Sequence, residues 1–209
     1  MNATEMFDRC FGQCPLVAII RGVTPGEAVA IGEALVEGGI RIIEVPLNSP
    51  EPLASIERLT QRFGEDALIG AGTVLRAEDV ARVKAAGGKL VVSPNMNAAV
   101  IRASVEAGMV SSPGVFTPSE AFAALENGAH ALKLFPAEAA SPKVVKAIRA
   151  VLPKDVRLLV VGGVTPESVG GWLDAGANGF GLGGGVYKPG QSAEETLQKA
   201  RAYVTAVTR

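Results

Sequence analysis

The sequence is poor in the residues that mark several large classes of protein. It contains one histidine and two cysteines, which are too few for a multi-histidine metal site, a zinc set or a disulfide framework. It has 20 basic and 21 acidic residues, a balance that argues against nucleic acid or a membrane surface as a partner. No apolar run reaches the ~18 residues that suggest a transmembrane helix. We therefore expect no metal, no nucleic acid and no membrane.

The first residues also lack the features of an export signal. The segment MNATEMFDRCFGQ is polar and acidic, whereas a signal peptide needs a basic start and an apolar run. Cys10 and Cys14 are spaced to share one face of a helix. We interpret them as free thiols in a reducing cytoplasm.

Apolar residues, in contrast, are plentiful. They make up 48% of the 209 residues and the mean hydropathy is +0.28, so the chain can bury a sizeable core. The length predicts a single domain over residues 1–209.

Short apolar runs alternate with longer segments of helical periodicity along the whole chain. Eight runs predict strands: Leu16–Ile20, Arg41–Val45, Ala67–Gly70, Lys89–Ser93, Met109–Ser112, Ala129–Phe135, Arg157–Val161 and Ala177–Leu182. Helices are predicted near residues 25–38, 51–63, 76–87, 97–107, 117–127, 141–151, 166–175 and 192–207.

Capping signals support several of these helices. A hydroxyl residue before a proline predicts a helix start, because the hydroxyl can cap the first turn and proline suits the first helical position. Such pairs are Thr24-Pro25, Ser49-Pro50, Thr117-Pro118, Ser141-Pro142 and Thr165-Pro166. Glycines follow several predicted helices and act as stop signals.

Eight strand–helix units predict an α/β protein with a closed (β/α)8 barrel, the TIM-barrel architecture. The residues before Leu16 predict a short extra helix over the lower mouth of the barrel. The alternative is an open doubly wound sheet, but no GxGxxG motif follows the first strand.

Active sites of such barrels lie at the carboxyl ends of the strands. Lys133 lies within the apolar run Ala131–Pro136, where burial would lower the pKa of its amine. A neutral amine in a pocket is a nucleophile that forms Schiff bases with carbonyl compounds. The alternative is a strand-end lysine that reaches water or pairs with a carboxylate.

Three further side chains are expected at the same mouth. Glu44 follows two isoleucines, and burial would raise its pKa toward values useful for proton transfer. Arg21 offers a fork for a substrate carboxylate, and Phe135 shares the inward parity of Lys133. The alternative for Glu44 is an ion pair with a nearby lysine or arginine. The alternative for Arg21 is a purely structural ion pair with Glu44.

Glycines end the last two strands. Gly162-Gly163 and Gly183-Gly184-Gly185 stand where these barrels bind phosphate through loop amides. The alternative is that they form ordinary tight turns. The single histidine, His130, is predicted on the opposite face of the strand from Lys133, so we expect no catalytic role for it.

Several motifs together resemble one enzyme family from about Leu16 to the end of the chain. They are Ile42-Ile43-Glu44-Val45, Ile69-Gly70-Ala71-Gly72-Thr73-Val74-Leu75, Ser93-Pro94, Leu132-Lys133-Leu134-Phe135-Pro136-Ala137-Glu138 and Val161-Gly162-Gly163-Val164. This set resembles the KDPG/KHG class I aldolases, pyruvate-dependent enzymes that cleave 2-keto-3-deoxy-6-phospho sugar acids.

The resemblance implies roles for these positions. Lys133 would form the Schiff base with pyruvate, and Glu44 would move protons directly or through water. Thr73 and Pro94 would line the pyruvate site. The phosphate of the sugar acid would bind at Gly162, Gly163, Gly183 and Gly184. The resemblance further implies a homotrimer and no cofactor, because the imine does the electrophilic work of a metal.

Two branches of the family differ near Glu44. In the 6-phosphogluconate branch an arginine after the glutamate holds the substrate carboxylate, and here Asn48 replaces it. Arg21-Gly22 and the segment Glu44–Pro50 resemble the 6-phosphogalactonate branch, in which Arg21 would hold the carboxylate. Family members often carry a serine where this chain has Gly183-Gly184-Gly185, and backbone amides could bind phosphate instead.

The resemblance therefore favours cleavage of the 6-phosphogalactonate sugar acid into pyruvate and glyceraldehyde 3-phosphate. A 6-phosphogluconate or dual-specificity aldolase is the nearest alternative. Two more distant ones are a phosphate-binding barrel isomerase or synthase, with Lys133 only as a charge, and a binding protein for phospho-sugar acids without turnover.

Overall fold

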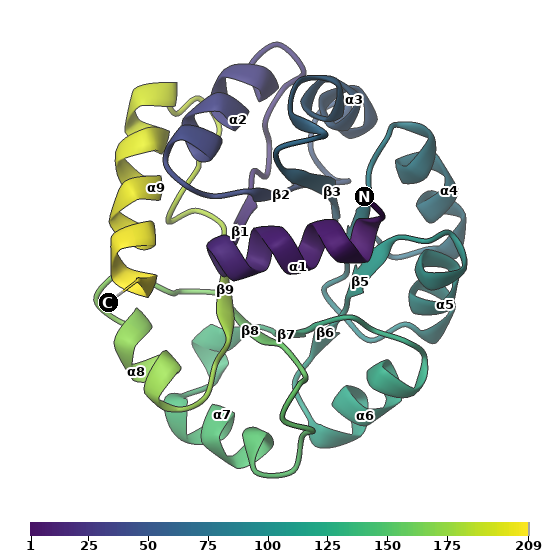
Figure 1. Cartoon of the computed structure of the whole chain (residues 1–209), viewed down its shortest axis with the longest axis vertical. Helices are drawn as coiled ribbons and strands as arrows, with labels where there is room; N and C mark the ends of the chain where they lie inside the picture. The colour runs from purple at the N-terminus through teal and green to yellow at the C-terminus, as the bar shows by residue number, and fades with distance from the viewer. Residues whose placement is uncertain (209) are drawn as a thin grey trace.

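Parallel strands follow one another around a ring in the computed structural model, which describes residues 1–208 (Figure 1). Along the ring the order is β5-β4-β3-β2-β1-β9-β8-β7-β6. The strands are β1 Leu16–Ile19, β2 Ile42–Pro46, β3 Leu68–Gly72, β4 Leu90–Val92, β5 Val110–Ser112, β6 Gly114–Val115, β7 Leu132–Leu134, β8 Leu158–Val161 and β9 Gly179–Leu182. The predicted (β/α)8 barrel is confirmed.

The ring closes where β5 and β6 meet at Pro113. Proline has no backbone N–H, so the strand is interrupted there. The carbonyl of Ser111 accepts a hydrogen bond from the amide of His130, and the carbonyl of Pro113 accepts one from the amide of Lys133, both at 2.9 Å. The fifth predicted strand was therefore drawn too short, because it continues beyond residue 112 as β6.

One helix covers an end of the ring and the others surround it (Figure 1). Helix α1, Ala3–Gln13, lies across the barrel as predicted and begins with a capping box between Asn2 and Glu5. The surrounding helices are α2 Ala28–Glu37, α3 Pro52–Phe63, α4 Ala77–Ala85, α5 Ala98–Glu106, α6 Pro118–Glu126, α7 Pro142–Arg149, α8 Val169–Asp174 and α9 Ala193–Val207. Among residues 1–208, no helix is long and apolar enough to cross a membrane.

Two predicted helix starts are wrong by three residues. Helices α2 and α8 begin at Ala28 and Val169, after hydrogen-bonded turns at the expected starts. In the first of these turns the Thr24 hydroxyl donates to the Glu27 carboxylate at 2.6 Å, so it does not cap the helix. Thr117, by contrast, caps α6 as predicted, with a capping box to Glu120.

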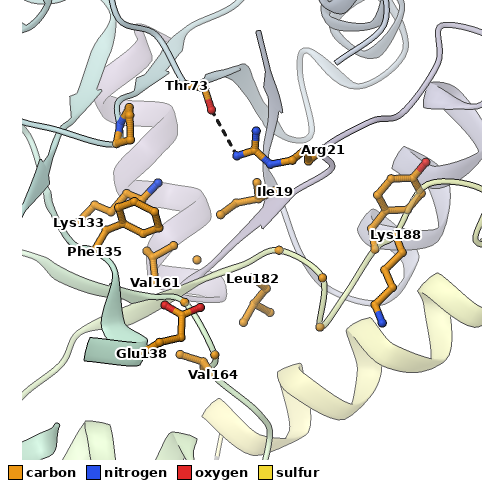
Figure 2. Close-up of a pocket in the computed structure, with 18 of the residues that line it drawn as sticks. Ile19, Arg21, Thr73, Lys133, Phe135, Glu138, Val161, Val164, Leu182 and Lys188 are labelled. Carbon is orange, nitrogen blue, oxygen red and sulfur yellow. Dashed lines mark hydrogen bonds between the residues drawn. The ribbon is translucent and has the colours of Figure 1, made fainter. Parts of the chain in front are cut away.

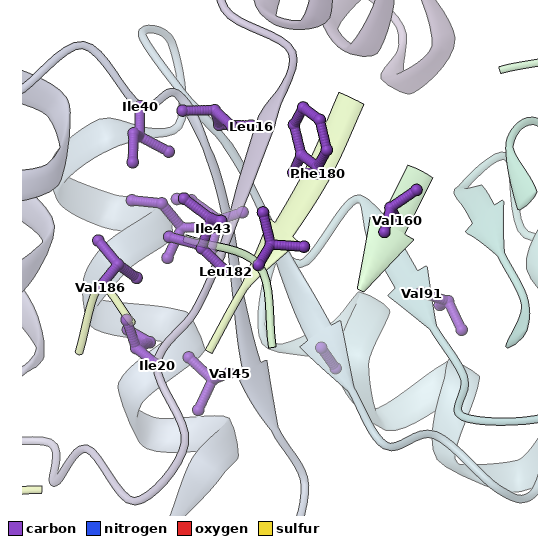
Figure 3. Packing of buried hydrophobic residues seen from close by; sticks show 14 of the residues in the cluster. Leu16, Ile20, Ile40, Ile43, Val45, Val91, Val160, Phe180, Leu182 and Val186 are labelled. Atoms are coloured by element: carbon purple, nitrogen blue, oxygen red, sulfur yellow. The ribbon is translucent and has the colours of Figure 1, made fainter. Parts of the chain in front are cut away.

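The hydrophobic core consists of two layers of apolar side chains. The outer layer joins strands to helices and includes Leu16, Ile43 and Phe180 (Figure 3). The inner layer fills the barrel with inward strand residues and with side chains of α1, among them Phe7 and Phe11. Because α1 fills the lower end, the open space lies at the carboxyl ends of the strands.

Candidate active site

A cavity of about 360 Å³ opens at the carboxyl ends of the strands. Of the predicted site residues, those that line it are Arg21, Thr73, Pro94, Lys133, Phe135, Gly162, Gly163, Gly183 and Gly184. In Figure 2, Lys133 and Phe135 lie on one side of the cavity, and Arg21 and Thr73 lie across from them. The structure thus brings together every predicted site residue except Glu44, which lies just below.

Lys133 is the buried amine that the sequence predicted. It lies in the middle of β7 with 8% of its surface exposed, and its Nζ stands 4.6 Å from the centre of the Phe135 ring. Burial lowers the pKa of this amine, the Glu44 carboxylate raises it, and the Arg21 guanidinium lowers it further. Lys133 can therefore supply the neutral amine that attacks a carbonyl carbon.

Glu44 lies below the open cavity, on β2. It is 1% exposed and borders a second space of about 20 Å³ that it shares with Lys133, a volume that suits one water molecule. Its Oε2 has no hydrogen-bond partner among residues 1–208. Burial raises the pKa of Glu44 to about 7, against the opposing charges of Lys133 and Arg21. A carboxyl group with this pKa can both take and return a proton near neutral pH.

Gly72 makes room for the Glu44 carboxyl group. It is the last residue of β3, and a Cβ at this position would lie 1.8 Å from Glu44 Oε2. Any side chain at residue 72 would displace the acid. The sequence signal was the run Gly70-Ala71-Gly72-Thr73, but the steric need for glycine became visible only in the structure.

Arg21 is held in place by two neighbours. Its guanidinium donates one hydrogen bond to the Asn48 Oδ1 and another, at 3.4 Å, to the Thr73 hydroxyl. Thr73 has φ 55°, a left-handed conformation that is costly for a β-branched residue and that clusters at functional sites. Within residues 1–208 no salt bridge joins Arg21 to Glu44, so the guanidinium remains available to a carboxylate.

The contact between Asn48 and Arg21 was not predicted. The sequence had shown Asn48 only as a replacement for an arginine. The two residues are 27 positions apart in the sequence. Arg21 follows β1 and Asn48 follows β2, and these two strands are neighbours in the sheet. Adjacent strand ends were the available signal, but sequence does not give the direction of either side chain.

The glycine loops form the far end of the cavity. Gly162 and Gly163 have φ values of 118° and 64°, which other residues adopt only with strain. Added Cβ atoms at Gly183 and Gly184 would meet little or nothing, whereas one at Gly185 would lie 2.2 Å from the Tyr203 hydroxyl. The loop therefore presents bare backbone to the cavity, and residue 185 has no room for a larger side chain.

Two charged residues that the sequence did not single out also line this end. Glu138 packs against Gly162, where a Cβ would lie 2.0 Å from its carboxylate, and Lys188 lies beside Gly184 (Figure 2). Glu138 belonged to a motif that the sequence displayed, but its distance from Lys133 along the chain gave no indication of its place in the cavity.

Known proteins that are similar to this chain in sequence belong to one family. The family model described as KDPG and KHG aldolase matches residues 8–201. The 2-dehydro-3-deoxy-6-phosphogalactonate aldolase of Escherichia coli (strain K12) is 50% identical over 92% of this chain and 94% of that protein. The KHG/KDPG aldolase of the same organism is 33% identical over 76% of this chain and 74% of that protein.

The fold comparison gives the same result. A solved structure described as "Native KDPGal structure" superposes with a TM-score of 0.92 at 48% sequence identity, covering 94% of this chain and 95% of that one.

Proposed function

The chain belongs to the KDPG and KHG aldolase family, and from this membership we propose that it cleaves 2-dehydro-3-deoxy-6-phosphogalactonate into pyruvate and glyceraldehyde 3-phosphate. It is an aldolase, and hence a carbon–carbon lyase. The observation that carries the proposal is the buried Lys133 amine, which borders both the open cavity and the small space beside Glu44. That placement would put a nucleophile and an acid–base group next to the same bound substrate.

The proposed mechanism uses the imine as an electron sink. The neutral amine of Lys133 attacks the C2 ketone, the Glu44 carboxyl group gives its proton to the departing hydroxyl, and loss of water leaves a protonated imine and a Glu44 carboxylate. Glu44, acting directly or through a water in the space beside it, takes the proton from the C4 hydroxyl. The C3–C4 bond breaks, the electron pair enters the imine, and glyceraldehyde 3-phosphate leaves. The enamine is then protonated at C3, and hydrolysis releases pyruvate and restores the amine.

Substrate binding divides between the two ends of the cavity. Arg21, oriented by Asn48 and Thr73, would hold the carboxylate next to the reacting ketone. Thr73, Pro94 and Phe135 would enclose the pyruvyl group. The backbone amides of Gly162, Gly163, Gly183 and Gly184 would hold the phosphate at the far end.

The galactonate substrate is favoured over its gluconate epimer by similarity. Two relatives named for 6-phosphogalactonate are 50% and 48% identical to this chain. Four relatives named for phosphogluconate or KHG are 32% to 36% identical to it. A preference for the gluconate epimer, or equal use of both, is the second candidate.

The proposal extends to assembly and location. We place the enzyme in the cytoplasm as a homotrimer whose residues 1–209 form one domain. Leu75, Phe116 and Phe122 are large apolar side chains that stand 36% to 50% exposed, and a second copy of the chain would cover such groups. Cys10 and Cys14 are free thiols in the structure, which suits a reducing compartment.

Reductive trapping tests the function directly. The protein is treated with borohydride in the presence of saturating pyruvate, and intact mass and peptide mapping then locate any adduct. We expect a reduced pyruvyl group on Lys133 and none when pyruvate is omitted. A folded protein that gains no adduct would contradict the imine mechanism and leave an isomerase or a binding protein.

The same sample tests the substrate. We expect kcat/KM to be higher for the galactonate epimer than for the gluconate epimer, because a pocket that fits one C4 configuration misplaces the hydroxyl of the other relative to Glu44. If kcat/KM is equal for the two epimers or higher for the gluconate epimer, while pyruvate is still trapped on Lys133, the imine mechanism stands. The substrate is then the second candidate.

Replacement of Arg21 by alanine should weaken binding of the carboxylate. We expect KM for the sugar acid to rise about 10- to 100-fold, because a charge-assisted hydrogen-bonded contact is worth about 1.5–3 kcal/mol. Steady-state kinetics at several substrate concentrations gives the value. Asn48→Ala is the matched control, since it removes only the group that orients Arg21 and should raise KM less. An unchanged KM in Arg21→Ala would remove this residue from the site.

A further inference from the structure

One side chain of α1 closes the space beneath the Glu44 and Lys133 pair. Phe7 is 1% exposed and lines the same small cavity as both catalytic groups. Apart from these two groups, Ser112 is the one polar residue among the described residues that line it. The underside of the site is thus mostly apolar. Phe7 is the lining residue that comes from α1, before the first strand of the barrel.

The Phe7 ring is held firmly from the other side. The guanidinium of Arg157 lies 5.0 Å from the centre of the Phe7 ring and 5.2 Å from that of Phe11. Arg157 also pairs with Asp8 of the same helix at 2.6 Å, and the two rings are 5.4 Å apart. This cluster fixes α1 across the barrel and keeps Phe7 directed into it.

We propose that Phe7 is a positioning residue for the aldol reaction, whose ring closes the small cavity from below to all but the single water it can hold and so favours the uncharged forms of Glu44 and Lys133. The inference rests on the proposed function. Water admitted from below would stabilise the ammonium and the carboxylate, and an ammonium cannot attack a ketone.

The surroundings of the pair support this view. Burial is the largest cause both of the raised pKa of Glu44 and of the lowered pKa of Lys133. The charged groups that act on Glu44 are Lys133 on β7 and Arg21 after β1, and both oppose the effect of burial. Gly72 of β3 and Phe7 of α1 contribute no charge. Loss of the Phe7 ring would therefore leave Lys133 and Arg21 in place and open the cavity from below, and any shift of Arg157, which stacks on both Phe7 and Phe11, would be shared by a variant that loses Phe11.

Phe7→Ala and Phe11→Ala form a matched pair of variants. Both rings belong to α1, both are buried and both contact Arg157. Within residues 1–208, the lining of the small cavity includes Phe7 but not Phe11. The two variants should thus lose similar packing, and only Phe7→Ala should open the site from below.

The measurement is the rate of imine formation with pyruvate, trapped by reduction, at neutral and at alkaline pH. We expect Phe7→Ala to be slower than the wild type by about tenfold at pH near 7, which corresponds to one unit of pKa, and to approach it at alkaline pH, where the ammonium loses its proton. Phe11→Ala should keep the wild-type ratio of the two rates. Should Phe7→Ala not fold, Phe7→Leu should show a smaller change in the same direction.

The outcomes separate the two proposals. A wild-type ratio in the folded Phe7 variant, or the same changed ratio in Phe11→Ala, would overturn the role of Phe7 while the aldolase mechanism stands. Absence of any imine in the wild type would overturn both.

Discussion

Methionine in place of Lys133 is expected to abolish aldol cleavage. Without the amine no imine forms, and the electrons of the C3–C4 bond have no acceptor. We expect kcat to fall by at least about 10⁴-fold, the scale on which loss of a covalent nucleophile acts. A coupled assay for released pyruvate gives the rate. Methionine is of similar length and apolar, so it should pack against Phe135 without disturbing β7.

Lys133→Arg is the control that separates covalent from electrostatic roles. Arginine keeps the positive charge but does not lose its proton in proteins, so it cannot become a neutral nucleophile. We expect this variant to be as inactive as the methionine variant, with both folded by circular dichroism. Substantial activity in Lys133→Arg would show that Lys133 acts only as a charge, which is what the isomerase or synthase alternative requires.

The sequence predicted that Lys133 and Glu44 are buried at one site because burial and chain position are both local features. An apolar strand that contains a lysine, or that places a glutamate after two isoleucines, implies a buried charge wherever the strand lies. The barrel repeat then implied that Lys133, Glu44 and Arg21 share one mouth, because parallel strands present their carboxyl ends on one side. The structure confirms that Lys133 and Arg21 line one cavity and that Glu44 lies beneath it.

The details that sequence missed depend on side-chain directions between distant segments. Asn48 reaches Arg21, the Glu44 carboxyl group occupies the space above Gly72, and Phe7 reaches the underside of the site. None of these contacts has a local pattern. The two displaced helix starts have another cause, because a hydroxyl before proline suits a turn as well as a helix cap.

Glutamine in place of Glu44 is the second substitution with a large expected effect. Its shape is nearly that of the acid, so it fits against Gly72, but it can neither take nor return a proton. We expect kcat to fall by about 10²- to 10⁴-fold, the usual contribution of a general acid–base group. The pH profile of kcat should also lose the inflection near neutrality that Glu44 supplies, given its pKa of about 7. An unchanged kcat would assign proton transfer to another group.

The same variant should become more stable relative to the wild type as pH rises. The pKa of Glu44 is about 7 in the folded protein against 4.5 for the free side chain. Between these values the unfolded chain binds fewer protons than the folded one, so the contribution of Glu44 to stability falls as pH increases. The full difference between the two pKa values corresponds to a loss of about 3 kcal/mol in the free energy of unfolding. Glutamine does not titrate, so the variant does not lose this stability.

Urea unfolding of both proteins at pH 4.5 and pH 8 measures this change. The free energy of unfolding of Glu44→Gln minus that of the wild type should rise by up to about 3 kcal/mol between the two pH values. Lys133 is present in both proteins, so only the part of its titration that depends on the Glu44 charge enters the difference. A difference that stays constant with pH would mean that Glu44 is not the neutral, buried acid described above. A rising difference would show that the barrel retains a destabilising carboxyl group beside Lys133, as expected where catalysis rather than stability has selected the residue.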